Sequence, residues 1–103
     1  MKQKCAPSEE VLSEMERLLG IASDMTRLKI LYSILSSEKC VSEIVEDVHA
    51  SQSLVSHQLK ILKDANLVSS RKEGPRVFYS LADEHVTLLL DVVYDHAQEK
   101  FPK

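Results

Sequence analysis

Apolar residues recur three or four positions apart over most of the chain, which is the spacing of one face of an α-helix. Five segments carry this pattern and are predicted to be helices: 8–22, 24–36, 40–48, 52–65 and 83–100. Residues that cap helix N-termini stand at the start of four of them, namely Ser8, Asp24, Ser51 and Asp83. The pattern therefore predicts a mainly α-helical protein.

The periodicity changes after Asn66. Residues 67–72 and 76–81 are strand-like, and residues 73–75 between them predict a turn. A helix, a short turn at 49–51, a second helix and then a β-hairpin follow one another in the winged helix-turn-helix fold. The expected fold class is therefore mainly α with a β-hairpin wing.

The fourth predicted helix has two faces of different character. The apolar residues expected to face the core are Leu54, Val55, Leu59 and Leu62. The other face carries short or flat hydrogen-bonding side chains near its start and lysines near its end. Such groups suit base edges and phosphates in the major groove of DNA.

Composition limits the protein to a small, well-packed domain. The chain has 103 residues, of which 44% are hydrophobic and 28% charged, and only two are glycine. We expect one domain over 1–103, with 1–7 as a mobile arm and 8–22 and 83–100 as dimerisation helices. No apolar run approaches the roughly 18 residues that span a bilayer, and no secretory signal is recognised at the start, so a cytoplasmic protein is expected.

The charge is unevenly distributed. The net charge is −3, but residues 50–81 hold five basic and two acidic side chains, while the flanking segments are acidic. A basic region inside an acidic chain is typical of a surface that meets nucleic acid. The predicted DNA-contacting residues are Gln52, Ser53, Ser56, His57, Lys60 and Lys63 of the helix, and Arg71, Lys72 and Arg76 of the hairpin.

The same segments resemble the ArsR/SmtB family of bacterial metal-sensing repressors. The run Ser51–Lys63 with Asn66-Leu67-Val68 is similar to the family's recognition helix, the run Asp24–Leu31 to its early helix motif, and Val77–Leu81 to the end of its hairpin. The resemblance covers roughly residues 10 to 100. It implies a homodimer that binds an inverted-repeat operator and represses transcription.

The last predicted helix holds four candidate metal ligands. His85 and His96 are 11 positions apart, close to three full turns, and Glu99 lies one turn beyond on the same face; Asp83 stands at the start. The two histidines are roughly 16 Å apart along the axis, too far to share an ion whose bond to nitrogen is about 2 Å. Two antiparallel copies would instead bring Asp83 and His85 of one chain to His96 and Glu99 of the other, twice per dimer.

Two imidazoles and two carboxylates suit Zn²⁺, with Co²⁺ and Cd²⁺ as alternatives. The pattern also resembles the zinc site on the last helix of the family's zinc sensors. That resemblance implies a hydrogen bond from His96 to the backbone carbonyl of Asn66, which would connect the metal to the DNA-reading helix. From the residues alone, Asp83 can equally be a helix cap, and the histidines and Glu99 can be solvated surface groups.

A second site is a weaker prediction. The segment 38–43 resembles the family's cysteine-containing metal box but has one cysteine, so Cys5, Cys40 and Glu43 would give only three ligands. A thiolate site of this kind favours soft ions such as Cd²⁺ or Pb²⁺. Two cysteines are too few for a disulfide framework, and two reduced thiols are an equally good interpretation.

The function expected from the sequence is a zinc-responsive repressor whose partners are operator DNA and a second copy, with no membrane and no small organic substrate. One alternative is a thiol or soft-metal sensor that uses Cys5 and Cys40. An alternative of another class is a metal-binding or interaction protein that does not bind DNA. An enzyme is not expected, because the sequence has no phosphate-binding glycine-rich loop, nucleophile elbow or HExxH motif.

Overall fold

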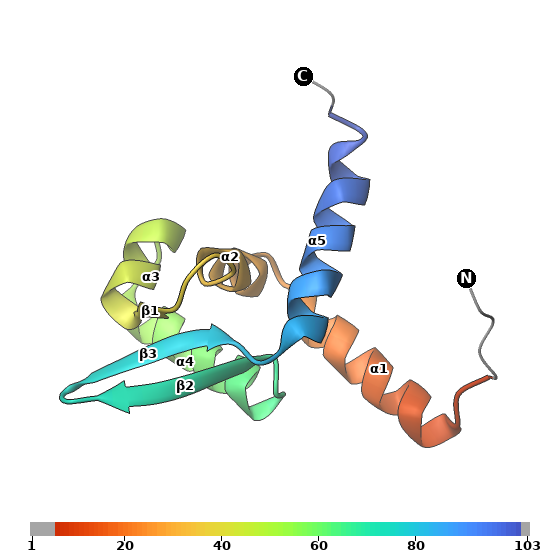
Figure 1. Cartoon of the computed structure of the whole chain (residues 1–103), viewed down its shortest axis with the longest axis horizontal. Coiled ribbons are helices and arrows are strands. Elements are labelled where there is room, and N and C mark those ends of the chain that lie inside the picture. Colours follow the sequence, from red (N-terminus) through yellow and green to blue (C-terminus); the bar gives the residue numbers. More distant parts are fainter. Residues whose placement is uncertain (1–5, 102–103) are drawn as a thin grey trace.

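The structure is a computed structural model that describes residues 6–101 (Figure 1). Its elements in chain order are α1 Glu9–Ala22, α2 Met25–Ser33, β1 Lys39–Cys40, α3 Val41–Val48, α4 Gln52–Asp64, β2 Val68–Glu73, β3 Arg76–Leu81 and α5 Glu84–Gln98. The five predicted helices and the predicted hairpin are confirmed. No helix formed by these residues is long and apolar enough to cross a membrane. The predictions for Cys5 and for most of the 1–7 arm concern residues outside the described range.

The four predicted N-caps are also confirmed. The Ser8 hydroxyl accepts from the Val11 N–H at 3.2 Å, and the Ser51 hydroxyl accepts from the Leu54 N–H at 3.1 Å. The Asp24 carboxylate accepts from the Arg27 N–H at 3.0 Å, and Asp83 accepts from two N–H groups of α5. Each cap satisfies backbone donors that a helix leaves unpaired at its start.

The predicted second helix is too long at its C-terminal end. The structure ends α2 at Ser33, although Ile34 remains buried at 2% exposure. Apolar residues therefore keep contacting the core after the backbone has left the helix. Ser36 and Ser37 follow, and serine hydroxyls compete for backbone hydrogen bonds and weaken a helix.

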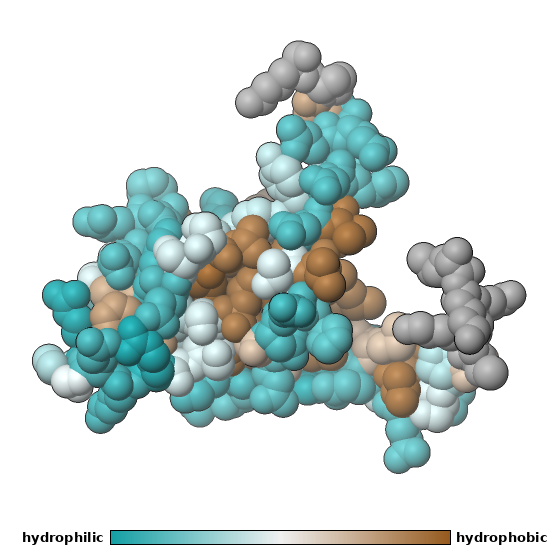
Figure 2. All heavy atoms as spheres, in the orientation of Figure 1, coloured by the Kyte–Doolittle hydropathy of each residue, from teal (hydrophilic) through white to brown (hydrophobic). Residues whose placement is uncertain are grey.

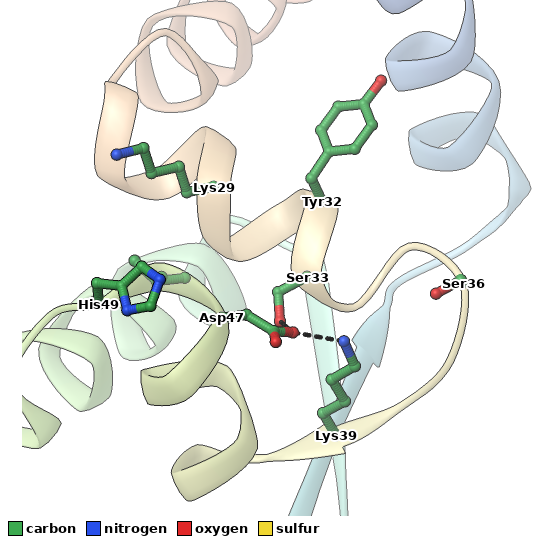
Figure 3. A pocket seen from close by; sticks show the side chains of 8 residues that line it. Lys29, Tyr32, Ser33, Ser36, Lys39, Asp47 and His49 are labelled. Carbon is green, nitrogen blue, oxygen red and sulfur yellow. Dashed lines mark hydrogen bonds and ion pairs between the residues drawn. The ribbon is translucent and has the colours of Figure 1, made fainter.

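The prediction of a two-stranded hairpin is incomplete, because β1 joins it as a third strand. The sheet order is β1-β3-β2, with all pairs antiparallel and Lys39 opposite Tyr79. Lys39 Nζ lies 2.5 Å from the Asp47 carboxylate of α3, which also accepts from the Ser33 hydroxyl at 2.7 Å (Figure 3). These bonds attach the sheet edge to the helical body. A two-residue strand is too short to give an alternating pattern.

The core lies between α2, α3 and α4. Its fully buried side chains are Ile30, Leu31, Ile34, Ile44, Val55, Leu59 and Leu62. The prediction that Leu54 faces inward is wrong, since 40% of Leu54 is exposed. At 100° per residue, Leu54 stands on the flank of α4, about a quarter turn away from Val55.

Helices α1 and α5 project from this core (Figure 1). No residue of α1 is buried, and α5 buries only Val86 and Leu90. Hydrophobic residues are visible along α1 and where α2 meets α5 (Figure 2). The largest exposed apolar side chains of these two helices are Val11, Leu12, Met15, Leu19, Leu88, Leu89, Val92, Val93 and Tyr94. Together they form a large uncovered apolar surface, which in a protein of this size indicates an interface.

Candidate DNA-reading surface and metal ligands

The polar residues of α4 lie on its solvent side. The side chains of Gln52, Ser53, Ser56, His57, Lys60 and Lys63 are exposed, as predicted. The opposite face is fixed by Val55 and Leu59, both fully buried. Burial of one face therefore presents a row of hydrogen-bonding groups on the other. This arrangement fits a helix that enters the major groove.

Gln58 makes a contact between helices that was not predicted from the sequence. Its side-chain oxygen accepts from Arg27 Nε at 2.6 Å, so it joins α4 to α2 across 31 residues of sequence. Gln58 is half-buried, unlike its neighbour His57. Its position beside the exposed face was the available signal, but its partner on another helix has no local signature.

The wing carries two kinds of basic residue. Lys72 and Arg76 are exposed and make no ion pair with another described residue. Arg71 instead contacts the carboxylates of Glu38 and Glu73, and its guanidinium lies 4.9 Å from the centre of the Phe78 ring. The hydrogen bonds that Arg71 donates, to Glu38 with the larger effect and to Glu73, raise the pKa of Arg71 above its usual range. The bond from Arg71 also lowers the pKa of Glu38.

The predicted ligands on α5 form two separate pairs. His85 Nδ1 lies 3.4 Å from an Asp83 carboxylate oxygen, and His96 Nδ1 lies 3.8 Å from a Glu99 carboxylate oxygen. The two imidazole side chains are 94% and 87% exposed. Asp83 also caps α5, with one carboxylate oxygen 2.9 Å from the His85 backbone N–H. The cap and the ligand interpretations of Asp83 are therefore compatible, because the cap fixes the carboxylate beside the imidazole.

The pairs stand at opposite ends of one face. At 100° per residue, His85 and His96 are about 20° apart around α5, and the exposed Val92 lies between them on the same side. Within residues 6–101, no three His, Cys, Asp or Glu side chains are close enough to hold one metal ion. One chain thus presents two separate pairs, each with an imidazole and a carboxylate. This donor set fits a borderline ion such as Zn²⁺.

Asn66 directly follows Ala65, the residue that caps the C-terminus of α4. The backbone of Asn66 is in the left-handed conformation, with φ of 63°. The chain then turns into β2, and the Leu67 N–H donates to the Leu62 carbonyl at 3.0 Å. No hydrogen bond joins His96 to Asn66 within the described part of a single chain.

Cys40 and Glu43 lie together at the start of α3. The Glu43 carboxylate accepts from the Cys40 backbone N–H at 3.0 Å and from its thiol at 3.2 Å. Both bonds lower the pKa of Glu43, and the bond from the backbone N–H has the larger effect. Cys40 is buried at 7% exposure, and Cys5 lies outside the described residues. The contact accounts for both residues as a capping arrangement that starts α3.

Comparison with known proteins identifies the family. Residues 24–70 match the family described as bacterial regulatory protein, arsR family. The chain is 40% identical over 86 residues to a transcriptional repressor SmtB homolog from Synechocystis, covering 84% of this chain and 65% of that protein. It is 37% identical over 87 residues to a cadmium resistance transcriptional regulatory protein CadC homolog from Staphylococcus aureus, covering 84% and 72%. The chain therefore spans about two thirds of the Synechocystis relative.

A solved structure agrees with the fold. The homodimeric winged helix-turn-helix DNA-binding domain of a possible ArsR-family transcriptional regulator from Mycobacterium bovis superposes with a TM-score of 0.84. It is 28% identical and covers 97% of this chain and 93% of that one. Fold and family are those of DNA-binding transcriptional regulators and not of enzymes. This chain has the winged helix-turn-helix fold and belongs to the arsR family of bacterial regulatory proteins.

Proposed function

We propose that the protein is a dimeric, zinc-responsive transcriptional repressor, released from its operator when zinc binds between the two α5 helices. The observation that carries this proposal is the pair of half-sites on one exposed face of α5. Each holds one imidazole and one carboxylate, at Asp83 and His85 and at His96 and Glu99. The names of the relatives, SmtB and CadC homologs, support metal regulation and leave the ion open. The donor set favours zinc.

The dimer is needed to complete each site. The uncovered apolar residues of α1 and α5 supply the surface, and the Mycobacterium bovis structure is a homodimer. If α5 and its twofold-related copy lie antiparallel, the start of one helix lies against the end of the other. Val92, 64% exposed in one chain, then lies in the seam between the two sites. Residues 1–103 act in this account as one domain, with α1 and α5 as its dimerisation helices.

A bound zinc ion would join the two chains, because it would coordinate two ligands from each. The protein's part is to hold Asp83 and His85 together through the cap of α5 and to present His96 and Glu99 one turn apart. Metal binding favours one arrangement of the two protomers over the other, by a differential free energy of about 1–3 kcal/mol. The expected bond between His96 and the Asn66 carbonyl is part of this proposal and requires the dimer.

The DNA-reading part comprises the exposed face of α4 and the wing. Gln52, Ser53, Ser56 and His57 meet base edges, and Lys60 and Lys63 lie nearer phosphates. Lys72 and Arg76 supply backbone contacts from the wing, while Arg71 must first leave its carboxylate partners. We place this regulator in the cytoplasm, where its operator would be.

The test is a zinc titration of the protein–DNA complex, followed by the fluorescence anisotropy of a duplex that the wild type selects from a random library. We expect zinc to release DNA from the wild type and not from His96→Ala. His49→Asn is the matched control, since His49 is exposed and has a positive φ that asparagine tolerates. Release of His96→Ala at the same free zinc as the wild type would contradict the α5 site.

A second variant, Cys5→Ser with Cys40→Ser, distinguishes a soft-metal or thiol response from a zinc response at α5. The proposal predicts that this variant retains zinc-dependent release, because Cys40 already has a capping role with Glu43. Loss of release in the double serine variant, with an intact fold, would favour the cysteine site. A wild type that binds no DNA at low salt would favour the alternative of a metal-binding protein.

A further inference from the structure

Apart from the contacts with their own N-capping residues, α4 and α5 are each joined to the rest of residues 6–101 by one side-chain hydrogen bond, and both bonds end on α2. The first runs from the Tyr32 hydroxyl to the backbone carbonyl of Leu90 in α5, at 3.0 Å. The second runs from Arg27 Nε to the side-chain oxygen of Gln58 in α4, at 2.6 Å. Helix α2 therefore donates a hydrogen bond both to α5, which holds the proposed metal ligands, and to α4, which holds the proposed DNA contacts.

The Tyr32 bond crosses an incompletely filled contact. The Tyr32 side chain extends from α2 toward α5 (Figure 3), and its ring centre lies 5.8 Å from that of Tyr94. Beside it, an apolar groove of about 270 Å³ is lined by Leu28, Tyr32, Val93, Tyr94 and others from both helices. Burial, followed by the nearby Asp91 carboxylate, raises the pKa of Tyr32, so its hydroxyl keeps its proton at neutral pH. The bond fixes one point of α5 while its outer half remains unpacked.

The Arg27 bond lies at the opposite end of α2. Besides Gln58, the Arg27 guanidinium donates to the Ile21 backbone carbonyl of α1 at 3.3 Å. Both contacts are partly buried, where a charged donor gives a stronger hydrogen bond than a neutral one. Arg27 thus contacts α4 at Gln58, next to the exposed His57. The end of α1, another helix of the uncovered apolar surface, is held at the same point.

Between these two bonds α2 is a short, rigid element. Ile30 and Leu31 are fully buried, and α2 spans nine residues. A closely packed helix of this length moves as one body, because core side chains leave little free volume. A displacement of α5 that keeps the Tyr32 bond must therefore be carried to Arg27 and Gln58.

We propose that α2 couples the metal-binding helix to the DNA-reading helix, with Tyr32 and Arg27 as the positioning residues at its two ends. The inference rests on the proposed function and adds a second connection between these helices, through α2, to the bond proposed between His96 and Asn66. It assigns no direct contact with metal or DNA to either residue. It predicts that removing either bond weakens the effect of zinc on DNA affinity more than it weakens zinc binding or DNA binding.

The experiment measures the ratio of DNA dissociation constants with and without zinc, using the selected duplex at fixed salt. Tyr32→Phe removes only the hydroxyl, and Tyr94→Phe is its control, since it removes a neighbouring hydroxyl with no hydrogen bond to another described residue. We expect Tyr32→Phe to reduce the ratio about 3- to 10-fold, as one hydrogen bond allows. Zinc affinity and metal-free DNA affinity should change less than about 3-fold, and Tyr94→Phe should match the wild type.

A double variant tests whether the bonds act in series. Arg27→Met should also reduce the ratio, and Tyr32→Phe with Arg27→Met should reduce it no further than the stronger single variant. Multiplying losses, an unchanged ratio in Tyr32→Phe, or an equal loss in Tyr94→Phe would overturn the proposal. If Arg27→Met does not fold by circular dichroism, the two tyrosine variants decide alone. If zinc does not change the DNA affinity of the wild type, the proposed function itself is refuted. This outcome is distinct from failure of the α2 proposal alone.

Discussion

Helices α4 and α5 both carry apolar side chains but bury them to very different extents. In α4, Val55, Leu59 and Leu62 are fully buried in the protein's own core. In α5, Leu89, Val92 and Val93 are 39%, 64% and 53% exposed. Self-burial explains why α4 can present a defined polar face to a ligand. The open face of α5 is typical of an interface with a second protein surface.

The difference separates two kinds of stability. We expect substitutions in the core face of α4 to act on the folding of each chain, and substitutions in the open face of α5 to act on association. The proposed metal ligands lie on the open face, beside Val92, so our proposal couples association to metal binding. Matched substitutions in the two helices can break this separation.

The largest effect is expected from Leu59→Ala in α4. Removing a fully buried leucine lowers the free energy of unfolding by about 2–5 kcal/mol, a large part of the total for a small domain. The matched change Leu89→Ala in α5 should leave the urea midpoint nearly unchanged at low protein concentration. In the wild type, dimerisation should make the urea midpoint rise with protein concentration, and Leu89→Ala should abolish this rise. Equal losses at low concentration would show that α5 is buried within one chain.

A charge on the open face is the next largest perturbation. Val92→Glu should raise the dimer dissociation constant by at least about 100-fold, because an unpaired carboxylate would be buried at the seam. Gln98→Glu adds the same charge to the same helix away from that face, and should leave the dimer intact. Sedimentation velocity over a dilution series measures both. A dimeric Val92→Glu variant would place the interface elsewhere.

A smaller effect concerns the polar contacts around the core. Hydrogen bonds from Lys39 and then Ser33 lower the pKa of Asp47 below the ordinary value of about 3.9. A carboxyl with a lowered pKa in the folded state stabilises the fold above its unfolded pKa. That stability is lost as the pH falls through the folded pKa. Urea unfolding between pH 7 and pH 3 should therefore show a steeper acid loss in the wild type than in Asp47→Asn, and parallel curves would contradict this.

The smallest expected effect is at the wing. Glu38→Gln weakens the pairing of Arg71, which frees its guanidinium for phosphate. We expect modestly tighter DNA binding and a salt-dependence slope that steepens by up to about one phosphate contact. Glu46→Gln removes an equivalent charge from an exposed position without this pairing, and controls for net charge. Unchanged slopes in both variants would show that Arg71 stays paired in the complex.

Local signals in the sequence were sufficient for the helices and their caps. Ser8, Asp24, Ser51 and Asp83 each stand just before an apolar helical pattern, and a cap needs only neighbouring residues. The spacing of His85 and His96 was equally local, since both lie on one helix. That spacing also predicted that a single chain presents two separated half-sites. Whether a partner completes them stays a prediction.

Contacts between distant segments were not predictable in this way. The pairing of Lys39 with Tyr79 adds β1 to the sheet, and the bond between Arg27 and Gln58 links helices 31 residues apart. Neither leaves a periodic or compositional trace, because each depends on how the elements pack. The pairing of Arg71 with Glu38 was missed for the same reason, although it changes which wing residues are available to DNA.

The most direct test of the central claim uses two variants that each lack zinc binding. A heterodimer of His85→Ala with His96→Ala, purified with two affinity tags, has one interfacial site with both histidines replaced and one with both intact. Isothermal titration should find no high-affinity zinc in either homodimer and about one zinc per heterodimer. A heterodimer that binds no more zinc than its parents would contradict a site shared between two α5 helices.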